Sequence, residues 1–167
     1  MTALQGEHVV LREATAADVP RLAEILRTPE VARWWGDRVE QDLHDAIDDA
    51  DTTLWAVLAG GETIGLVQAW EEPDPMYRHA AIDISLHPAW HGRGLGADTV
   101  RTVARHLFED RGHHRVTIDP AAANERAIRS YERVGFRPVG VMRAYERGPD
   151  GSWHDGLLMD MLAGELQ

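Results

Sequence analysis

The feature that most constrains this chain is a short loop with three glycines at alternate positions, set between a predicted strand and a predicted helix. The loop reads His91-Gly92-Arg93-Gly94-Leu95-Gly96-Ala97. Because glycine has no Cβ, three glycines let the backbone curl close to a ligand. The free N–H groups at the start of the following helix, together with the helix dipole, then favour an anion. The loop therefore predicts a pyrophosphate site, to which Arg93 can add positive charge.

A dinucleotide-binding fold is one alternative for this loop. Gly92, Gly94 and Ala97 match the G-x-G-x-x-A fingerprint, and Asp119 stands about where such folds place a ribose-binding acid. However, Pro88 and further loop residues separate the strand from the first glycine, whereas the fingerprint turns directly off its strand. About 70 residues follow the loop, too few for the usual second half and a substrate domain. The context therefore argues against a dinucleotide site.

Hydrophobic periodicity predicts a mixed α/β fold around the loop. Antiparallel strands precede the loop, and two of them are joined by a turn at Gly60-Gly61. After the loop come a helix, a strand, a second helix and a final hairpin. The predicted strands span residues 8–12, 53–58, 63–70, 80–86, 115–118, 139–145 and 153–162. The predicted helices are one that starts near Thr15 or Asp18 and is ended by Pro29, then 40–50, 95–109 and 124–134. We expect a single domain over residues 1–167, with a mixed, mostly antiparallel central sheet flanked by helices on both faces.

Composition argues against several classes of function. The 167 residues include no Cys, which excludes a thiolate metal site and a Cys nucleophile, and the nine His lack metal-ligand spacing, so no metal is expected. A formal net charge of −11 disfavours nucleic acid and anionic membranes as partners and would steer cationic substrates inward. With neither a signal peptide nor an apolar run of membrane-spanning length, a cytoplasmic location is expected.

A second motif follows the glycine loop. Asn124, Ala127, Tyr131, Gly135 and Phe136 form N-x-x-A-x-x-x-Y-x-x-x-G-F. The two motifs together resemble those of the GNAT superfamily of N-acetyltransferases. In that family the loop pattern is Gln/Arg-x-x-Gly-x-Gly/Ala, and here the first position is His91. The resemblance implies the family's α/β fold and the transfer of an acetyl group from acetyl-CoA to an amine.

The resemblance also implies roles on the acetyl-CoA side. The loop from His91 to Ala97, with the helix after it, would hold the pyrophosphate. The strand end at Ser85 and Leu86 would pair with the pantetheine arm, and a backbone N–H near Leu86 would polarise the acetyl carbonyl. Asn124 would contact the pantetheine or phosphate arm, and Ala127 lies on the same helix.

Acetyl transfer also needs groups that move protons. An alkylamine is protonated at pH 7, so a carboxylate or a water chain must remove a proton before the nitrogen attacks. Asp83 is the candidate, because it interrupts an apolar strand and its neighbours Ile82 and Ile84 should face the other side of the sheet. By resemblance, Tyr131 is the acid that protonates the departing thiolate.

Two subfamilies compete for the identity of the amine. Four segments resemble the aminoglycoside N-acetyltransferases of the 6′ type: Trp34-Trp35-Gly36, the acidic loop from Glu71 to Asp74, the strand with Ile82-Asp83, and Asp119-Pro120 ahead of Asn124. That resemblance implies a polycationic sugar held by carboxylates. The substrate contacts would be Trp34, Trp35, Glu72, Asp74, Asp83 and Asp119, although core packing of the tryptophans and an ordinary Asp-Pro turn remain alternatives.

Segments near the two ends of the chain resemble a different subfamily. Residues 10–13 and 140–162 resemble the ribosomal-protein N-terminal acetyltransferases. A third alternative is a non-catalytic acyl-CoA-binding domain, against which the presence of Asp83 and Tyr131 argues. The resemblance to the 6′-type enzymes favours an aminoglycoside as the small cationic amine, and the acidic composition agrees with it. Homodimers are common in the family, which leaves a homodimer open.

Overall fold

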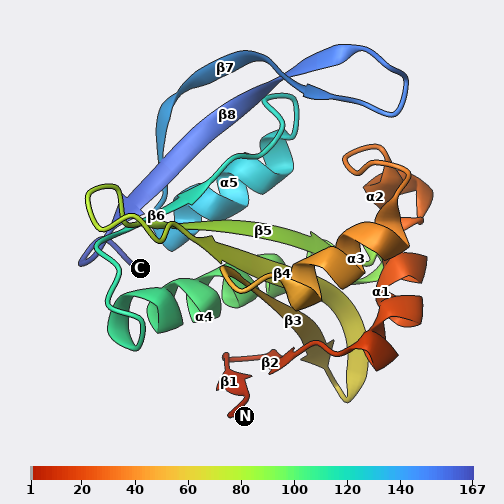
Figure 1. The fold of residues 1–167 in the computed structure, drawn as a ribbon, viewed down its shortest axis with the longest axis horizontal. Helices are drawn as coiled ribbons and strands as arrows, with labels where there is room; N and C mark the ends of the chain where they lie inside the picture. Colours follow the sequence, from red (N-terminus) through yellow and green to blue (C-terminus); the bar gives the residue numbers. More distant parts are fainter. Residues whose placement is uncertain (1) are drawn as a thin grey trace.

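The structure, a computed structural model, describes residues 2–167 and builds one eight-stranded sheet from them. The strand order is β1-β2-β3-β4-β5-β6-β8-β7, in which β5 and β6 run parallel and the other neighbours run antiparallel. The strands are β1 (Leu4–Gln5), β2 (Val10–Glu13), β3 (Thr52–Ala59), β4 (Glu62–Glu71), β5 (Ala80–Leu86), β6 (Arg115–Ile118), β7 (Arg137–Arg147) and β8 (Trp153–Leu162). The helices are α1 (Val19–Leu26), α2 (Pro29–Ala32), α3 (Val39–Asp48), α4 (Leu95–Glu109) and α5 (Glu125–Val134). The mixed, mostly antiparallel sheet expected from the sequence is confirmed, and Figure 1 shows its arrangement.

Element boundaries agree with the sequence prediction where local signals are strong. β5, α4 and β6 begin and end at the predicted residues. The first predicted strand is displaced to β2, and the short β1 before it was not predicted. Pro29 was predicted to end a helix, but α1 has already ended at Leu26 and Pro29 begins α2. A proline suits a first turn, because its fixed φ is helical and its missing N–H would have no intrahelical acceptor there.

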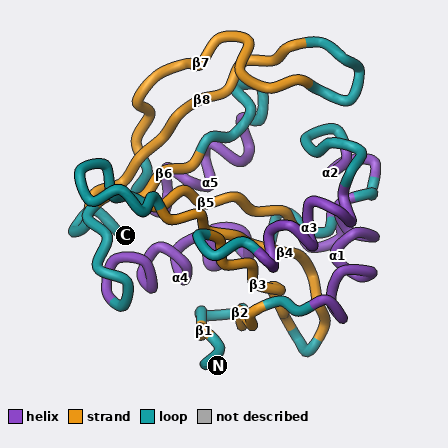
Figure 2. The backbone as a smooth tube through the Cα atoms, in the orientation of Figure 1, coloured by secondary structure: helices purple, strands orange, loops and turns teal. Residues whose placement is uncertain are grey.

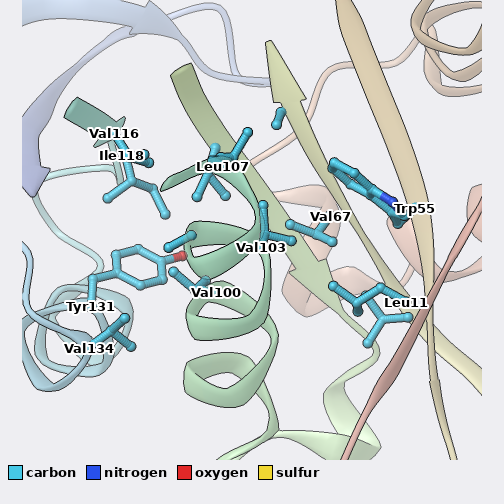
Figure 3. Packing of buried hydrophobic residues seen from close by; sticks show 14 of the residues in the cluster. Leu11, Trp55, Val67, Val100, Val103, Leu107, Val116, Ile118, Tyr131 and Val134 are labelled. Carbon is cyan, nitrogen blue, oxygen red and sulfur yellow. The ribbon is translucent and has the colours of Figure 1, made fainter. Parts of the chain in front are cut away.

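The two faces of the sheet carry separate cores. Alternate residues of a strand point to opposite faces, so Leu54 packs with α1, α2 and α3, whereas its neighbour Trp55 packs on the side of α4 and α5. Leu66 and Val67 of β4 divide in the same way. Figure 3 shows the core of the α4 and α5 face, with labels on Leu11, Trp55, Val67, Val100, Val103, Leu107, Val116, Ile118, Tyr131 and Val134. The Tyr131 side chain of α5 is therefore held by packing within this core.

β5 extends beyond its parallel neighbour. The pairs between β5 and β6 run from Ala80 with Val116 to Ile82 with Ile118, where β6 ends. β5 continues to Leu86, held on its other side by β4. In Figure 1, β8 and β7 lean away from the end of β5. The sheet therefore opens beside residues 83–86, and one edge of this segment faces the opening.

A buried carboxylate ties the start of the chain to α4. Asp98 accepts the backbone N–H groups of Glu7, His8 and Val9 at 3.0, 2.7 and 3.1 Å. Asp98 is itself only 5% exposed. Hydrogen bonds to a charged acceptor are stronger than those to a neutral one, so this contact anchors residues 7–9 beside the first turns of α4.

Candidate functional site

A cavity of about 430 Å³ lies between the glycine loop and α5. Gly92 and Gly94 have φ angles of 74° and 77°, in the left-handed region that favours glycine, and Gly94 is the N-cap of α4. The N–H groups of Leu95, Gly96 and Ala97 lie in the first turn of α4, where they have no intrahelical acceptor. They therefore offer donors to an anion in this cavity, and the helix dipole adds to the attraction.

α5 forms the opposite wall of this cavity. Asn124 is its N-cap, and the Asn124 side chain accepts the Ala127 N–H at 3.3 Å. Arg126 and Arg133 also line the cavity, and both were missed in the sequence interpretation. Their spacing of seven residues places them on one helix face, which was the signal available. Two guanidinium groups near the glycine loop suit a ligand with several phosphates.

Most of the residues predicted to contact the cofactor line this cavity. They are Ser85, Leu86, His91, Gly92, Gly94, Leu95, Gly96, Ala97, Asn124 and Ala127. Arg93 lies outside the lining formed by residues 2–167, with its guanidinium 4.8 Å from the centre of the Trp90 ring. His91 donates from Nε2 to the Leu86 carbonyl at 2.8 Å, and burial lowers its pKa. Neutral His91 therefore fastens the loop to the end of β5.

A second cavity, of about 790 Å³, lies beside the open end of the sheet. Its carboxylates, within the described chain, are Asp42, Asp83, Asp119 and Glu146. Its larger aromatic side chains are Trp34, Trp35, Trp70, Tyr131 and Tyr145. No cationic side chain from residues 2–167 contributes to this lining. A cleft with several carboxylates and flat aromatic faces attracts a cationic amine by charge and by cation–π contact.

Asp83 has an unusual environment in this second cavity. Asp83 is accessible to solvent, but it lines the cleft together with the carboxylates and aromatic rings named above. Desolvation and, next, the charge of Asp119 raise the pKa of Asp83 to about 7. The cross-strand neighbour Gln68 offsets part of this rise through a hydrogen bond. As predicted, Ile82 and Ile84 pack on the opposite face. A carboxyl that titrates near neutrality is suited to accept and release a proton at physiological pH.

A bulge in β7 completes the cleft. The pairing with β8 shifts register between Met142 and Glu146, and Ala144 has a φ of 49°. The Ala144 N–H is held by Asp155 at 2.8 Å, and Gly156 leaves room for the Tyr145 ring, because a Cβ there would lie 2.9 Å from its Cδ1. β-bulges commonly redirect side chains near functional sites. Here the bulge brings Tyr145 and Glu146 into the cleft.

Tyr145 and Glu146 interact with Asp119 there. The Tyr145 hydroxyl donates to Asp119 Oδ2 at 2.6 Å. This hydrogen bond, with partial burial, raises the pKa of Tyr145 to about 12. Burial and the charge of Asp119 raise the pKa of Glu146 above its usual value. The predicted residue Asp119 therefore belongs to a cluster whose other members come from the hairpin.

The two cavities meet at a shared wall. The residues common to both linings are Trp34, Ile84, Ser85, Asn124 and Tyr131. Tyr131 is 8% exposed, and its ring packs edge-on against Phe136. Burial and the charge of Asp83 raise the pKa of Tyr131, so its phenol stays protonated at neutral pH. The predicted pair Asp83 and Tyr131 is therefore brought to the place where a ligand in one cavity can meet a ligand in the other.

The acidic loop between β4 and β5 does not contribute to the cleft. Glu72 and Asp74 are absent from the linings that residues 2–167 form around both cavities. Asp74 instead accepts the Met76 N–H, and Glu72 accepts the Asp74 N–H, both at 2.9 Å. The carboxylates that occupy the cleft beside Asp83 and Asp119 are Asp42 of α3 and Glu146 of β7. Glu72 and Asp74 are close to β5 in the sequence, but their loop leads into the start of that strand, whereas the cleft lies beside its other end.

The cleft has a wide mouth. A third cavity, of about 590 Å³, lies between the tip of the β7–β8 hairpin and the segment after α2, and it shares Trp35 and Gly36 with the second cavity. Figure 2 shows the tip of the β7–β8 hairpin opposite the loops next to α2.

The described residues include no group of three or more His, Asp or Glu able to hold a metal ion. None of the helices within 2–167 is both long and apolar enough to cross a membrane.

Comparisons with known proteins agree with this geometry. Residues 8–137 match the family described as acetyltransferase (GNAT) domain. The chain is 32% identical to an aminoglycoside N(6′)-acetyltransferase type 1 of Klebsiella pneumoniae, over 87% of this chain and 80% of that protein. It superposes on AAC(6′)-Ib in complex with paromomycin and acetyl-CoA with a TM-score of 0.77 and 28% identity, covering 94% of each chain. The ribosomal-protein-S5-alanine acetyltransferase of Vibrio fischeri gives a TM-score of 0.82 over the full length of both chains at 17% identity. Likeness of fold alone therefore does not select the substrate.

Proposed function

This chain belongs to the acetyltransferase (GNAT) domain family, and from that premise we propose that it acetylates an amino group of an aminoglycoside. As a family member it is an acetyl-CoA-dependent acyltransferase that acts on an amine. The observation that carries the proposal is the second cavity, which presents four carboxylates and several aromatic faces and no cation from residues 2–167. A sugar with several ammonium groups matches this lining, and an N-terminal peptide offers one such group at its acceptor end. The relative from Klebsiella pneumoniae supports the 6′-amino group as acceptor.

The first cavity fits the acetyl-CoA side of this reaction. Its positive-φ glycines, first-turn N–H groups and two arginines suit the phosphates. The edge of β5 beside residues 83–86 suits the amide-containing pantetheine arm, because an extended chain can add to an open strand edge. The thioester would then lie at the shared wall, next to Ser85 and Tyr131.

Asp83 and Tyr131 supply the proton transfers in this proposal. Asp83 accepts a proton from the bound ammonium, directly or through water, so that the nitrogen lone pair can attack the thioester carbonyl carbon. As the C–N bond forms and the C–S bond breaks, the electron pair leaves on sulfur. Tyr131, protonated at neutral pH, donates to that sulfur, and the second proton that the nitrogen loses passes through water to restore the phenol. The raised pKa makes the Tyr131 phenol a weak acid, so it first donates a hydrogen bond to the thiolate and transfers its proton afterwards.

A thiol-release assay with acetyl-CoA tests the substrate class. The acceptors are aminoglycosides, polyamines and N-terminal peptides, compared at constant pH. We expect the highest kcat/KM with an aminoglycoside and a fall in kcat/KM with added salt, since exposed charges are screened beyond about 8 Å at physiological ionic strength. A salt-insensitive enzyme that prefers peptides would overturn the aminoglycoside proposal and leave the family assignment intact.

Two matched variants locate the amine. Glu146→Gln removes a cleft carboxylate and should raise KM for the sugar roughly 3- to 10-fold, equivalent to losing about 1 kcal/mol of binding, with kcat nearly unchanged. Glu72→Gln makes the same change in the loop outside the cleft and should leave both constants at wild-type values. Equal effects of the two variants would contradict the proposed position of the sugar.

A further inference from the structure

Ser85 occupies a position that the proposed proton transfers do not use. It lies two residues after Asp83 on β5, so both side chains point to the same face of the sheet. Ser85 also lines both cavities, as Tyr131 does. A hydroxyl is therefore present where the thioester and the amine would meet.

A tryptophan fixes the orientation of this hydroxyl. Trp35 Nε1 lies 2.6 Å from Ser85 Oγ, although the two residues are 50 positions apart in the sequence. An indole N–H can only donate, whereas a serine hydroxyl has one proton to donate and two lone pairs to accept with. Ser85 must therefore accept from Trp35, which leaves its own proton directed elsewhere. Within residues 2–167, no protein acceptor takes that proton.

We propose that the Ser85 hydroxyl, held by Trp35, donates a hydrogen bond to the carbonyl oxygen of the acetyl thioester during transfer. The proposal rests on the proposed function and adds a side-chain donor to it. When the amine nitrogen attacks the carbonyl carbon, the C=O π electrons move onto oxygen. Ser85 stabilises that negative charge without losing its proton. The charge returns to the carbonyl as the C–S bond breaks, so Ser85 ends the cycle unchanged.

Trp35 is a positioning residue in this proposal. Trp35 lines the second and third cavities, while its N–H donates to Ser85 at the shared wall. A donor aimed at the developing oxyanion lowers the barrier most when its direction is set before the reaction begins. Trp35 therefore links the wall of the second cavity, where the amine would bind, to the Ser85 hydroxyl that stabilises the transition state.

Infrared difference spectroscopy tests the contact without turnover. Acetyl-CoA labelled with ¹³C at the thioester carbonyl is bound to the protein without amine, and the carbonyl band is compared with that of free acetyl-CoA. We expect a shift to lower frequency in the wild type, a smaller shift in Ser85→Ala and a recovered shift in Ser85→Thr, which keeps the hydroxyl. Equal band positions in the wild type and Ser85→Ala would overturn the proposal.

Kinetics separate this role from simple packing. Ser85→Ala should lower kcat roughly 10²-fold, as removal of an oxyanion donor does, with KM for the amine within about threefold of wild type. Trp35→Phe keeps a ring in the cleft but loses the N–H, and it should lower kcat about tenfold in the wild type. In a Ser85→Ala background the same change should have no further effect on kcat, because the group that Trp35 orients is gone. Trp153→Phe, at an exposed position on β8, is the matched control and should behave as wild type.

The possible results assign failure to one proposal or the other. Additive effects of Trp35→Phe and Ser85→Ala would overturn the orienting role of Trp35. An acetylated Ser85 peptide after a single turnover would overturn the donor role in favour of a covalent one. If the wild type acetylates an amine and Ser85→Ala does so with the same kcat, the Ser85 proposal is rejected and the proposed function stands. A wild type that acetylates none of the amines would reject the proposed function itself.

Discussion

The pH dependence of acetyl transfer should report the ionisation of Asp83. Desolvation by the surrounding protein groups and the charge of Asp119 raise its pKa to about 7. Because only the carboxylate can accept the ammonium proton, the reactive fraction of free enzyme is about 0.9 at pH 8, 0.5 at pH 7 and 0.1 at pH 6. We therefore expect kcat/KM to fall about fivefold between pH 7 and pH 6. A carboxyl with the unperturbed pKa of about 3.9 would give almost no change over this range.

The assay is the initial rate of thiol release at subsaturating amine, measured from pH 5.5 to 8.5 at constant ionic strength. Asp119→Asn removes the neighbouring charge, so the pKa of Asp83 should fall and the acid limb should move to lower pH. Only part of the rise in the pKa of Asp83 should be lost, since desolvation is its larger cause. Glu62→Gln, on the β3–β4 hairpin, removes one charge outside the cleft lining and should leave the limb in place.

Two amines of different basicity distinguish the enzyme from its substrate. A limb that belongs to Asp83 keeps its position when the amine is exchanged, and it disappears in Asp83→Asn together with most of the activity. An acid limb that persists in Asp83→Asn, or one that Asp119→Asn does not move, would refute the argument that Asp83 is the titrating base.

Three other perturbations have definite expected outcomes. Acetyl-CoA should raise the Tm of the wild type, because it binds the folded loop, and Gly94→Val should abolish that rise. Gly61→Val places the same residue at a similar φ, 84° against 77°, on a hairpin away from the loop and should keep the rise; a Gly94→Val protein with a normal Tm shift would contradict the loop assignment. Tyr131→Phe should lower kcat roughly 10²–10⁴-fold with KM for acetyl-CoA nearly unchanged, and equal turnover would mean that another group protonates the thiolate. Asp98→Asn should lower the free energy of unfolding by roughly 1–3 kcal/mol in a urea titration, because an amide cannot accept all three N–H groups of residues 7–9; wild-type stability would show that the contact is dispensable.

The sequence alone determined the local geometry and the family. The limits of β5, α4 and β6 follow from periodicity and from flanking glycine and proline residues, which act over a few positions. The glycines of the loop predicted a close approach of the backbone to a ligand, and the structure adds that Gly92 and Gly94 have positive φ angles, which glycine adopts without strain. The glycine loop, together with the motif that contains Asn124, Ala127 and Tyr131, indicated the GNAT superfamily.

Only the tertiary structure decided which other carboxylates share the cleft with Asp83 and Asp119. Asp42, Asp83, Asp119 and Glu146 come from four separate parts of the chain, and no local pattern connects them. Glu146 reaches the cleft through a bulge whose strain is balanced by contacts with β8, whereas Glu72 belongs to a loop that hydrogen-bonds within itself. The raised pKa of Asp83 likewise depends on the tertiary structure, because its two main causes are desolvation and the charge of Asp119, 36 positions away. Desolvation and charge repulsion depend on distance in space, and the packing of the sheet and its hairpin sets those distances.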